Sequence, residues 1–182
     1  MKEFFKVETI EGVLAHALSF TAVGTETVAL VDCLGRVTAE DVYSDVDIPD
    51  FNRSSMDGFA LKASSTFGAS EANPAYLNIR GQIRMGERPN FSIGPGEAAM
   101  IATGGMLPEG ADSVIMVEHT DTLDDTTIEA YRSVAPGQHV IEKGADIRHP
   151  EPALNEGKRI RHQEAGLLAA CSLGPKEDPT RY

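Results

Sequence analysis

The spacing of glycine and proline in the middle of the chain limits the folds that this sequence can adopt. Turn-forming residues separate short apolar runs over residues 77–79, 91–93, 98–101 and 114–117. Runs of this length between turn residues indicate strands rather than helices. The segment 126–131 alternates like an exposed strand, and we expect the acidic run 121–125 to be the turn before it. The middle of the chain is therefore predicted to be a small, mostly β domain.

The two ends of the chain predict helices and further short strands. Thr9 can cap a helix whose apolar residues share one face, and residues 25–31 contain the β-branched residues of a strand. Another short element is expected to end near Tyr43. Residues 154–160 indicate a strand around a turn at Gly157, followed by a final helix up to Leu173 that Gly174 would cap. The predicted fold class is α+β, mainly β.

Composition and charge make several classes of partner improbable. The formal net charge is -12, which repels nucleic acid and anionic lipid, so we expect neither as a partner. The short basic run 158–162 is interpreted as a solvated strand edge. Cys33 and Cys171 fit reduced thiols, and neither a signal peptide nor a membrane-spanning run is found, so a cytoplasmic protein is expected. The five histidines have no zinc-site spacing.

A polar stretch over residues 47–61 has the composition of a rigid loop. Pro49 holds Ile48 extended, and the Asp, Asn and Ser side chains that follow favour bonds to their own backbone. Asp57 and Gly58 precede an apolar run, which places Asp57 at the mouth of a buried strand. The alternative is that Asp57 and Gly58 only form a hairpin turn.

Two further segments contain candidate polar groups. In residues 101–114 a buried strand leads into Thr103, Gly104 and Gly105, where glycine N–H groups and a threonine hydroxyl could converge on an anion. A plain glycine turn is the alternative. Asp146 follows a glycine, where a carboxylate serves equally well as a cap or a solvated group.

These segments together resemble the MoeA family, the molybdopterin molybdenumtransferases. Residues 54–60 read Ser-Ser-Met-Asp-Gly-Phe-Ala, where the family has Ser-Ala-Met-Asp-Gly-Tyr-Ala after a proline and an aromatic residue. Residues 103–112 are similar to its Thr-Gly-Ala-x-x-Pro-x-Gly-Ala-Asp run, with Gly105 and Met106 as departures. Residues 144–147 are similar to its Gly-Glu-Asp-Ile, with Ala145 in place of the acid. The stretch 28–42 also resembles the segment that precedes the family's signature loop.

The resemblance implies both a site and a reaction. The reaction would be Mg²⁺-dependent insertion of molybdate into adenylylated molybdopterin with release of AMP. The residues expected to line one pocket are Asp57, Thr103 and Asp146 as catalytic groups, Asp57 and Asp146 as metal ligands, and Ser54, Ser55, Gly104 and Gly105 as substrate-binding groups.

The resemblance also implies a domain organisation and partners. Residues 1–45 and 140–175 would form a discontinuous linker domain for dimerisation, 46–139 an inserted β-rich domain, and 176–182 a loose tail. The family's catalytic α/β domain is not among these residues, so the chain alone is expected to be inactive. A homodimer is expected, with the molybdopterin adenylyltransferase as a further partner. The alternative function is a noncatalytic interaction or dimerisation module, as in the relative gephyrin.

Overall fold

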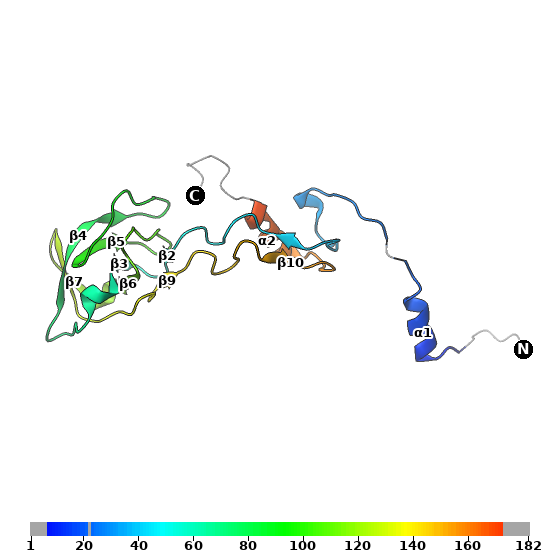
Figure 1. Cartoon of the computed structure of the whole chain (residues 1–182), viewed down its shortest axis with the longest axis horizontal. Coiled ribbons are helices and arrows are strands. Elements are labelled where there is room, and N and C mark those ends of the chain that lie inside the picture. The colour runs from blue at the N-terminus through cyan, green and yellow to red at the C-terminus, as the bar shows by residue number, and fades with distance from the viewer. Residues whose placement is uncertain (1–6, 22, 173–182) are drawn as a thin grey trace, which may run out of the picture.

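A computed structural model describes residues 7–21 and 23–172 as an elongated molecule with a β-sheet body at one end (Figure 1). The helices are α1 (Ile10–Ala17) and α2 (His162–Ser172), with three short 3₁₀ turns, η1 (Leu30–Asp32), η2 (Ala63–Thr66) and η3 (Val117–His119). The strands are β1 (Val42–Tyr43), β2 (Arg53–Ser54), β3 (Gly58–Leu61), β4 (Ala75–Ile83), β5 (Glu97–Ile101), β6 (Ser113–Met116), β7 (Thr120–Asp124), β8 (Thr127–Ala130), β9 (Val140–Ile141) and β10 (Pro152–Leu154). The predicted α+β, mainly β class is confirmed.

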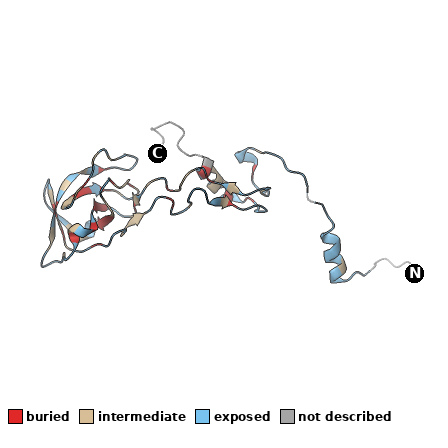
Figure 2. Cartoon of the chain, in the orientation of Figure 1, coloured by how far each residue is buried: buried red, intermediate tan, exposed pale blue. Residues whose placement is uncertain are grey.

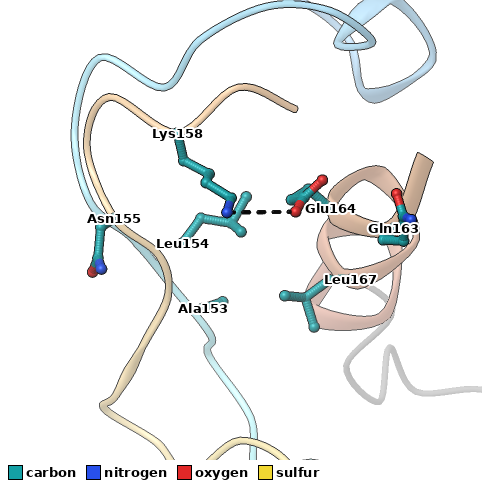
Figure 3. A pocket seen from close by; sticks show the side chains of 7 residues that line it. All are labelled: Ala153, Leu154, Asn155, Lys158, Gln163, Glu164 and Leu167. Atoms are coloured by element: carbon teal, nitrogen blue, oxygen red, sulfur yellow. Dashed lines mark ion pairs between the residues drawn. The ribbon is translucent and has the colours of Figure 1, made fainter. Parts of the chain in front are cut away.

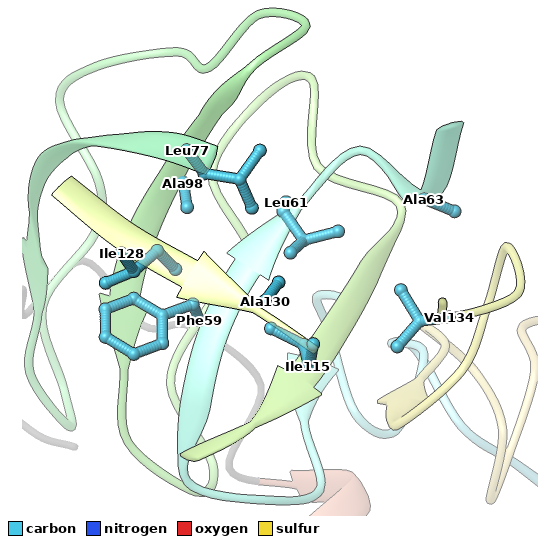
Figure 4. Packing of buried hydrophobic residues seen from close by; sticks show 9 residues of the cluster. All are labelled: Phe59, Leu61, Ala63, Leu77, Ala98, Ile115, Ile128, Ala130 and Val134. Carbon is cyan, nitrogen blue, oxygen red and sulfur yellow. The ribbon is translucent and has the colours of Figure 1, made fainter. Parts of the chain in front are cut away.

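A six-stranded sheet in the order β6-β3-β5-β4-β8-β7 forms the body. Strands β4 and β5 are parallel, and the other neighbours are antiparallel. Strand β3 is buried along its whole length because both faces of the sheet carry apolar cores. One core contains Phe59, Leu61 and Ile115 (Figure 4), and the other contains Ala60, Ile83 and Val114. The alternation of β3 residues between two cores explains its continuous apolar run.

Two predictions for the middle of the chain are wrong. Residues 121–124 belong to strand β7 rather than to a turn, because Asp121 lies opposite Glu129 of β8. The Tyr131 hydroxyl donates to Asp121 Oδ2 at 2.8 Å and to Glu129 Oε2 at 2.7 Å, which offsets the repulsion between the two carboxylates. The run 91–93 forms no strand; Ser92 makes a single bridge to Glu109.

Two antiparallel chain segments connect the body to the region around α2, and they lie side by side in Figure 1. Strand β2 pairs with β9, and β1 pairs with β10. Between these ladders, Ile48 N donates to Ile147 O at 2.8 Å and Gly144 N to Pro49 O at 2.8 Å. The segment before the body and the segment after it therefore run alongside each other, from the β2–β9 pair to the β1–β10 pair.

Helix α1 has the predicted start, since the Thr9 side chain accepts a hydrogen bond from Gly12 N at 3.1 Å. None of its residues is buried, and Ile10 and Leu18 are 75% and 86% exposed (Figure 2).

The strand predicted over 25–31 is wrong: only η1 forms there, because no neighbouring segment pairs with this stretch. Gly174, the predicted cap of the last helix, lies outside the described residues. None of the helices in the described ranges is long and apolar enough to cross a membrane.

Candidate functional site

The sequence motifs meet at one edge of the sheet. Gly58 at the start of β3 lies opposite Ile101 at the end of β5 and opposite Met116 at the end of β6. Ile83 at the end of β4 is the parallel partner of Ile101. The residues just outside these four strand ends therefore share one edge, and Asp57 and the turn at Thr103 are both among them.

Asp57 and Thr103 form a hydrogen-bonded unit, here called the aspartate–threonine pair. The Thr103 N–H donates to Asp57 Oδ1 at 2.7 Å, and the Thr103 hydroxyl donates to the same oxygen at 2.9 Å. The backbone donor first, and the hydroxyl second, lower the pKa of Asp57 below its ordinary value. The carboxylate is therefore ionised at neutral pH. Within the described residues no hydrogen bond occupies Oδ2, which leaves this oxygen for a ligand.

The hairpin alternative for Asp57 and Gly58 is wrong. Strand β2 pairs with β9 in a sheet of its own, whereas β3 lies in the six-stranded sheet, so the residues between them do not close a hairpin. Gly58 is required for packing, because a Cβ there would overlap the Ile115 carbonyl oxygen of β6. The prediction that Asp57 lies at a strand mouth is confirmed.

The turn formed by Thr103, Gly104 and Gly105 binds the Asp57 side chain through Thr103. Gly104 N donates to Ser54 O at 2.8 Å and Gly105 N donates to Ala102 O at 2.9 Å, so both glycine N–H groups bond within the protein. The Thr103 donors are engaged by Asp57. The expectation that the glycine N–H groups converge on an anion is therefore wrong for Gly104 and Gly105, whose N–H groups bond to carbonyl oxygens, and only the Thr103 donors reach an anionic group, the Asp57 side chain.

The predicted substrate-binding serines differ in accessibility. Ser54 is buried, and its hydroxyl donates to Met56 O at 2.5 Å and accepts from Met56 N at 3.2 Å. This local turn fixes the backbone that leads to Asp57. Ser55 is half-buried, and its N–H donates to His139 O at 3.0 Å. Ser54 therefore orients the loop, whereas the Ser55 hydroxyl is the more accessible of the two.

Asp146 lies apart from the aspartate–threonine pair. Its N–H donates to Ile48 O at 2.9 Å, on the connecting segments and away from the pairing of Ser54 with Val140. In the described ranges no hydrogen bond or ion pair joins Asp146 to Asp57 or Thr103, and no cluster of three or more His, Cys, Asp or Glu residues could hold a metal. A shared pocket for all three residues stays a prediction from the resemblance.

A hollow of about 270 Å³ lies between β10 and α2 (Figure 3), and none of the predicted site residues lines it. Glu164 faces it, and Lys158 Nζ lies 3.8 Å from Glu164 Oε1. Arg161 adds two side-chain hydrogen bonds to the same carboxylate, at 3.0 and 2.7 Å. The basic run 158–162 is thus tied to Glu164, and Arg159 pairs with Val37.

Arg53 is a site-edge residue that sequence reasoning missed. It lies within the signature loop, bridges Met106, and has a buried Nε atom without a hydrogen-bond partner among the described residues. The signal available in the sequence was an arginine within the polar loop 47–61 of a strongly acidic chain.

Comparisons with known proteins agree on one family. Residues 7–172 match the model of the MoeA N-terminal region (domain I and II). The chain is 36% identical over 148 residues to the molybdopterin molybdenumtransferase of Bacillus subtilis, and 31% identical over 150 residues to that of Synechococcus elongatus. These alignments cover 80% and 82% of this chain but 34% and 37% of the relatives, so the chain spans about a third of their length.

Solved structures show the same relationship. A crystal structure of the molybdopterin biosynthesis MoeA protein from Pyrococcus horikoshii superposes with a TM-score of 0.78 at 41% identity. It covers 91% of this chain and 42% of that one. A second solved structure, titled as a molybdopterin biosynthesis MoeA protein from Pyrococcus horikoshii OT3, superposes with a TM-score of 0.76 at 36% identity and covers 81% of this chain and 38% of that one.

Proposed function

The chain belongs to the MoeA family through its N-terminal region, and we propose that it supplies the N-terminal part of a molybdopterin molybdenumtransferase. In this proposal it helps to insert molybdate into adenylylated molybdopterin with release of AMP. The observation that supports it is the aspartate–threonine pair: an ionised carboxylate with one oxygen fixed by two donors and the other without a hydrogen bond among the described residues. Groups held in this way lose little freedom when the substrate binds.

The donor set at Asp57 fits Mg²⁺. This ion is commonly bound by one or two carboxylates together with substrate phosphates and water, so the single carboxylate of the pair is sufficient. Asp57 would hold the ion, which would stabilise negative charge on phosphate oxygens. Thr103 would keep the carboxylate ionised and oriented, and the buried Ser54 turn would hold the backbone before it.

The remainder of the site is proposed to come from outside this chain. The aligned part of this chain spans only 34% and 37% of these relatives, and Asp57 lies at one edge of a sheet. We propose that the chain works as a homodimer next to a nucleotide-binding segment, with the molybdopterin adenylyltransferase as the source of the substrate. A second candidate, a noncatalytic dimerisation module, is favoured by the exposed apolar face of α1.

Complementation tests the enzymatic proposal. The chain would be mixed with a curated relative from which the corresponding N-terminal region has been removed, together with adenylylated molybdopterin, molybdate and Mg²⁺. We expect AMP release from the mixture and none above background from either polypeptide alone. Release by this chain alone would show that the half-site account is wrong, and no release by a stable complex of the two would favour the noncatalytic module.

A further inference from the structure

Three arginines lie on the two segments that flank the turn holding Asp57, and they are here called the arginine edge: Arg53 on β2, and Arg84 and Arg88 in the loop after β4. Five other cations, Arg36, Arg80, Lys143, Lys158 and Arg161, each pair with a carboxylate. Within the described residues, no member of the arginine edge forms an ion pair, although acidic residues outnumber basic ones by 28 to 16. The arginine edge therefore keeps its charge available at the site.

The loop after β4 brings Arg84 and Arg88 to the turn. Because β4 and β5 are parallel and Ile83 pairs with Ile101, both strands end at the edge where Asp57 lies. The Met85 side chain reaches the turn: a Cβ on Gly104 would be 2.6 Å from Met85 Cε. Gly104 has a φ of +81°, so this position suits glycine on both counts. The loop that carries Arg84 and Arg88 is thus held beside the turn at Gly104 by Met85.

Arg53 approaches the same turn from the opposite side. Its backbone bridges Met106, and Gly104 N and Ser54 N hydrogen-bond across the same two segments. The Nε atom of Arg53 is buried without a partner in the described part of the chain. A buried donor without an acceptor is unfavourable, and an oxyanion is the acceptor that best satisfies a guanidinium.

The loop also borders a hollow of about 270 Å³, which Arg88, Asn90, Gln82 and Phe91 line. Glu87 is the carboxylate in this lining. The arginine and the two amide side chains in this lining carry N–H donors of the kind that phosphate oxygens accept.

We propose that the arginine edge binds the phosphate groups of the adenylylated substrate. This inference rests on the proposed function. A phosphate placed beside the ionised Asp57 would be repelled unless cations balance it, and the three unpaired arginines provide that balance. Their planar guanidinium groups can each donate two parallel hydrogen bonds to one phosphate group, a fixed geometry that the lysine ammonium lacks.

Titration of adenylylated molybdopterin into the chain tests the inference. We expect the exposed double variant Arg84→Gln/Arg88→Gln to weaken binding about 100-fold, since each charge-assisted contact contributes about tenfold. Inorganic pyrophosphate should compete with the substrate on the wild type and lose this effect on the double variant. Lys62→Gln is the matched control, because Lys62 follows β3 at its other end and forms no ion pair among the described residues.

The outcomes separate this inference from the proposed function. Equal affinities of the wild type, the double variant and Lys62→Gln would overturn the arginine edge while substrate binding itself stands. No binding by the wild-type chain, either alone or in complex with the relative that lacks its N-terminal region, would overturn both. Arg53→Gln provides a further arm: a folded variant with unchanged affinity would remove Arg53 from the edge.

Discussion

At the scale of single residues, the turn that follows β5 serves the side chain of Asp57. Its glycine N–H groups bond to Ser54 and Ala102, and its threonine donors bond to the carboxylate 46 residues earlier in the chain. The same fixed contacts lower the pKa of Asp57, so its charge persists well below neutral pH. An orientation of this kind suits a group that must meet a ligand without rearrangement.

Gly58 gives a prediction at this scale. Gly58→Ala is expected to lower the free energy of unfolding by more than about 3 kcal/mol, because the new methyl overlaps the Ile115 carbonyl oxygen and separates β3 from β6. Denaturant titration followed by circular dichroism measures the change. The control is Gly166→Ala in α2, where nothing lies within 4 Å and helix propensity should add about 0.5 to 1 kcal/mol. Similar stabilities of the two variants would show that β3 and β6 are not packed as described.

At the scale of elements, the start of α2 is held by a carboxylate network. Glu164 accepts from Arg161 N at 3.0 Å, which is half of a capping box, and from the Arg161 guanidinium. These bonds, the Arg161 side chain first, lower the pKa of Glu164 to about 2 from an ordinary 4.5. Because the folded pKa is the lower one, Glu164 stabilises the fold above pH 4.5, and this contribution is lost as the pH falls toward 2.

This network predicts a pH-dependent difference in stability. Glu164→Gln should lower the midpoint of thermal unfolding at pH 6, and the gap to the wild type should narrow steadily between pH 4.5 and 2.5. Differential scanning calorimetry across this range measures it. Glu156→Gln, on the neighbouring turn, should follow the wild type at every pH. A gap for Glu164→Gln that stays constant with pH would mean that the ionised carboxylate is not what stabilises α2.

The sequence patterns predicted the strands that bury one face or both faces. The apolar runs of β5 and β6 and the alternation in β8 are visible locally, as is the Thr9 cap of α1. Strand β7 was missed because its acidic residues resemble a turn, and Tyr131 makes them compatible with a ladder only in the folded sheet. The segment 25–31 has strand propensity but no partner. At the site, Asp57 was located by its strand, whereas its contact with Thr103 depends on the pairing of β3 with β5.

At the scale of the whole molecule, two features suit contact with further protein segments: the exposed helix α1 and the site at the edge of the sheet. Helix α1 has no buried residue, and its apolar side chains are exposed (Figure 2). The site lies at one edge of the sheet, next to β2. Both features suit a chain that completes its cores and its site through association. The relatives are longer than this chain, which aligns with only 34% and 37% of them, and this supports the same interpretation.

Association is expected in solution. We predict a homodimer at micromolar concentration, with the apolar face of α1 in the contact, because exposed Ile10 and Leu14 side chains gain stability when they leave water. Sedimentation velocity measures the mass, and Leu14→Lys should shift the distribution toward the monomer. A single species of 19.5 kDa for the wild type would contradict dimerisation of this chain.

The central claim is that the Asp57 carboxylate, fixed by Thr103, acts on the substrate. The most direct test measures AMP release by Asp57→Asn in the complementation mixture of this chain with a relative that lacks its N-terminal region. The amide oxygen still accepts from Thr103 N and keeps the loop, so the melting temperature should stay close to that of the wild type, while the rate should fall by about 100-fold or more once the charge is gone. An unchanged rate in a folded Asp57→Asn variant would contradict the account.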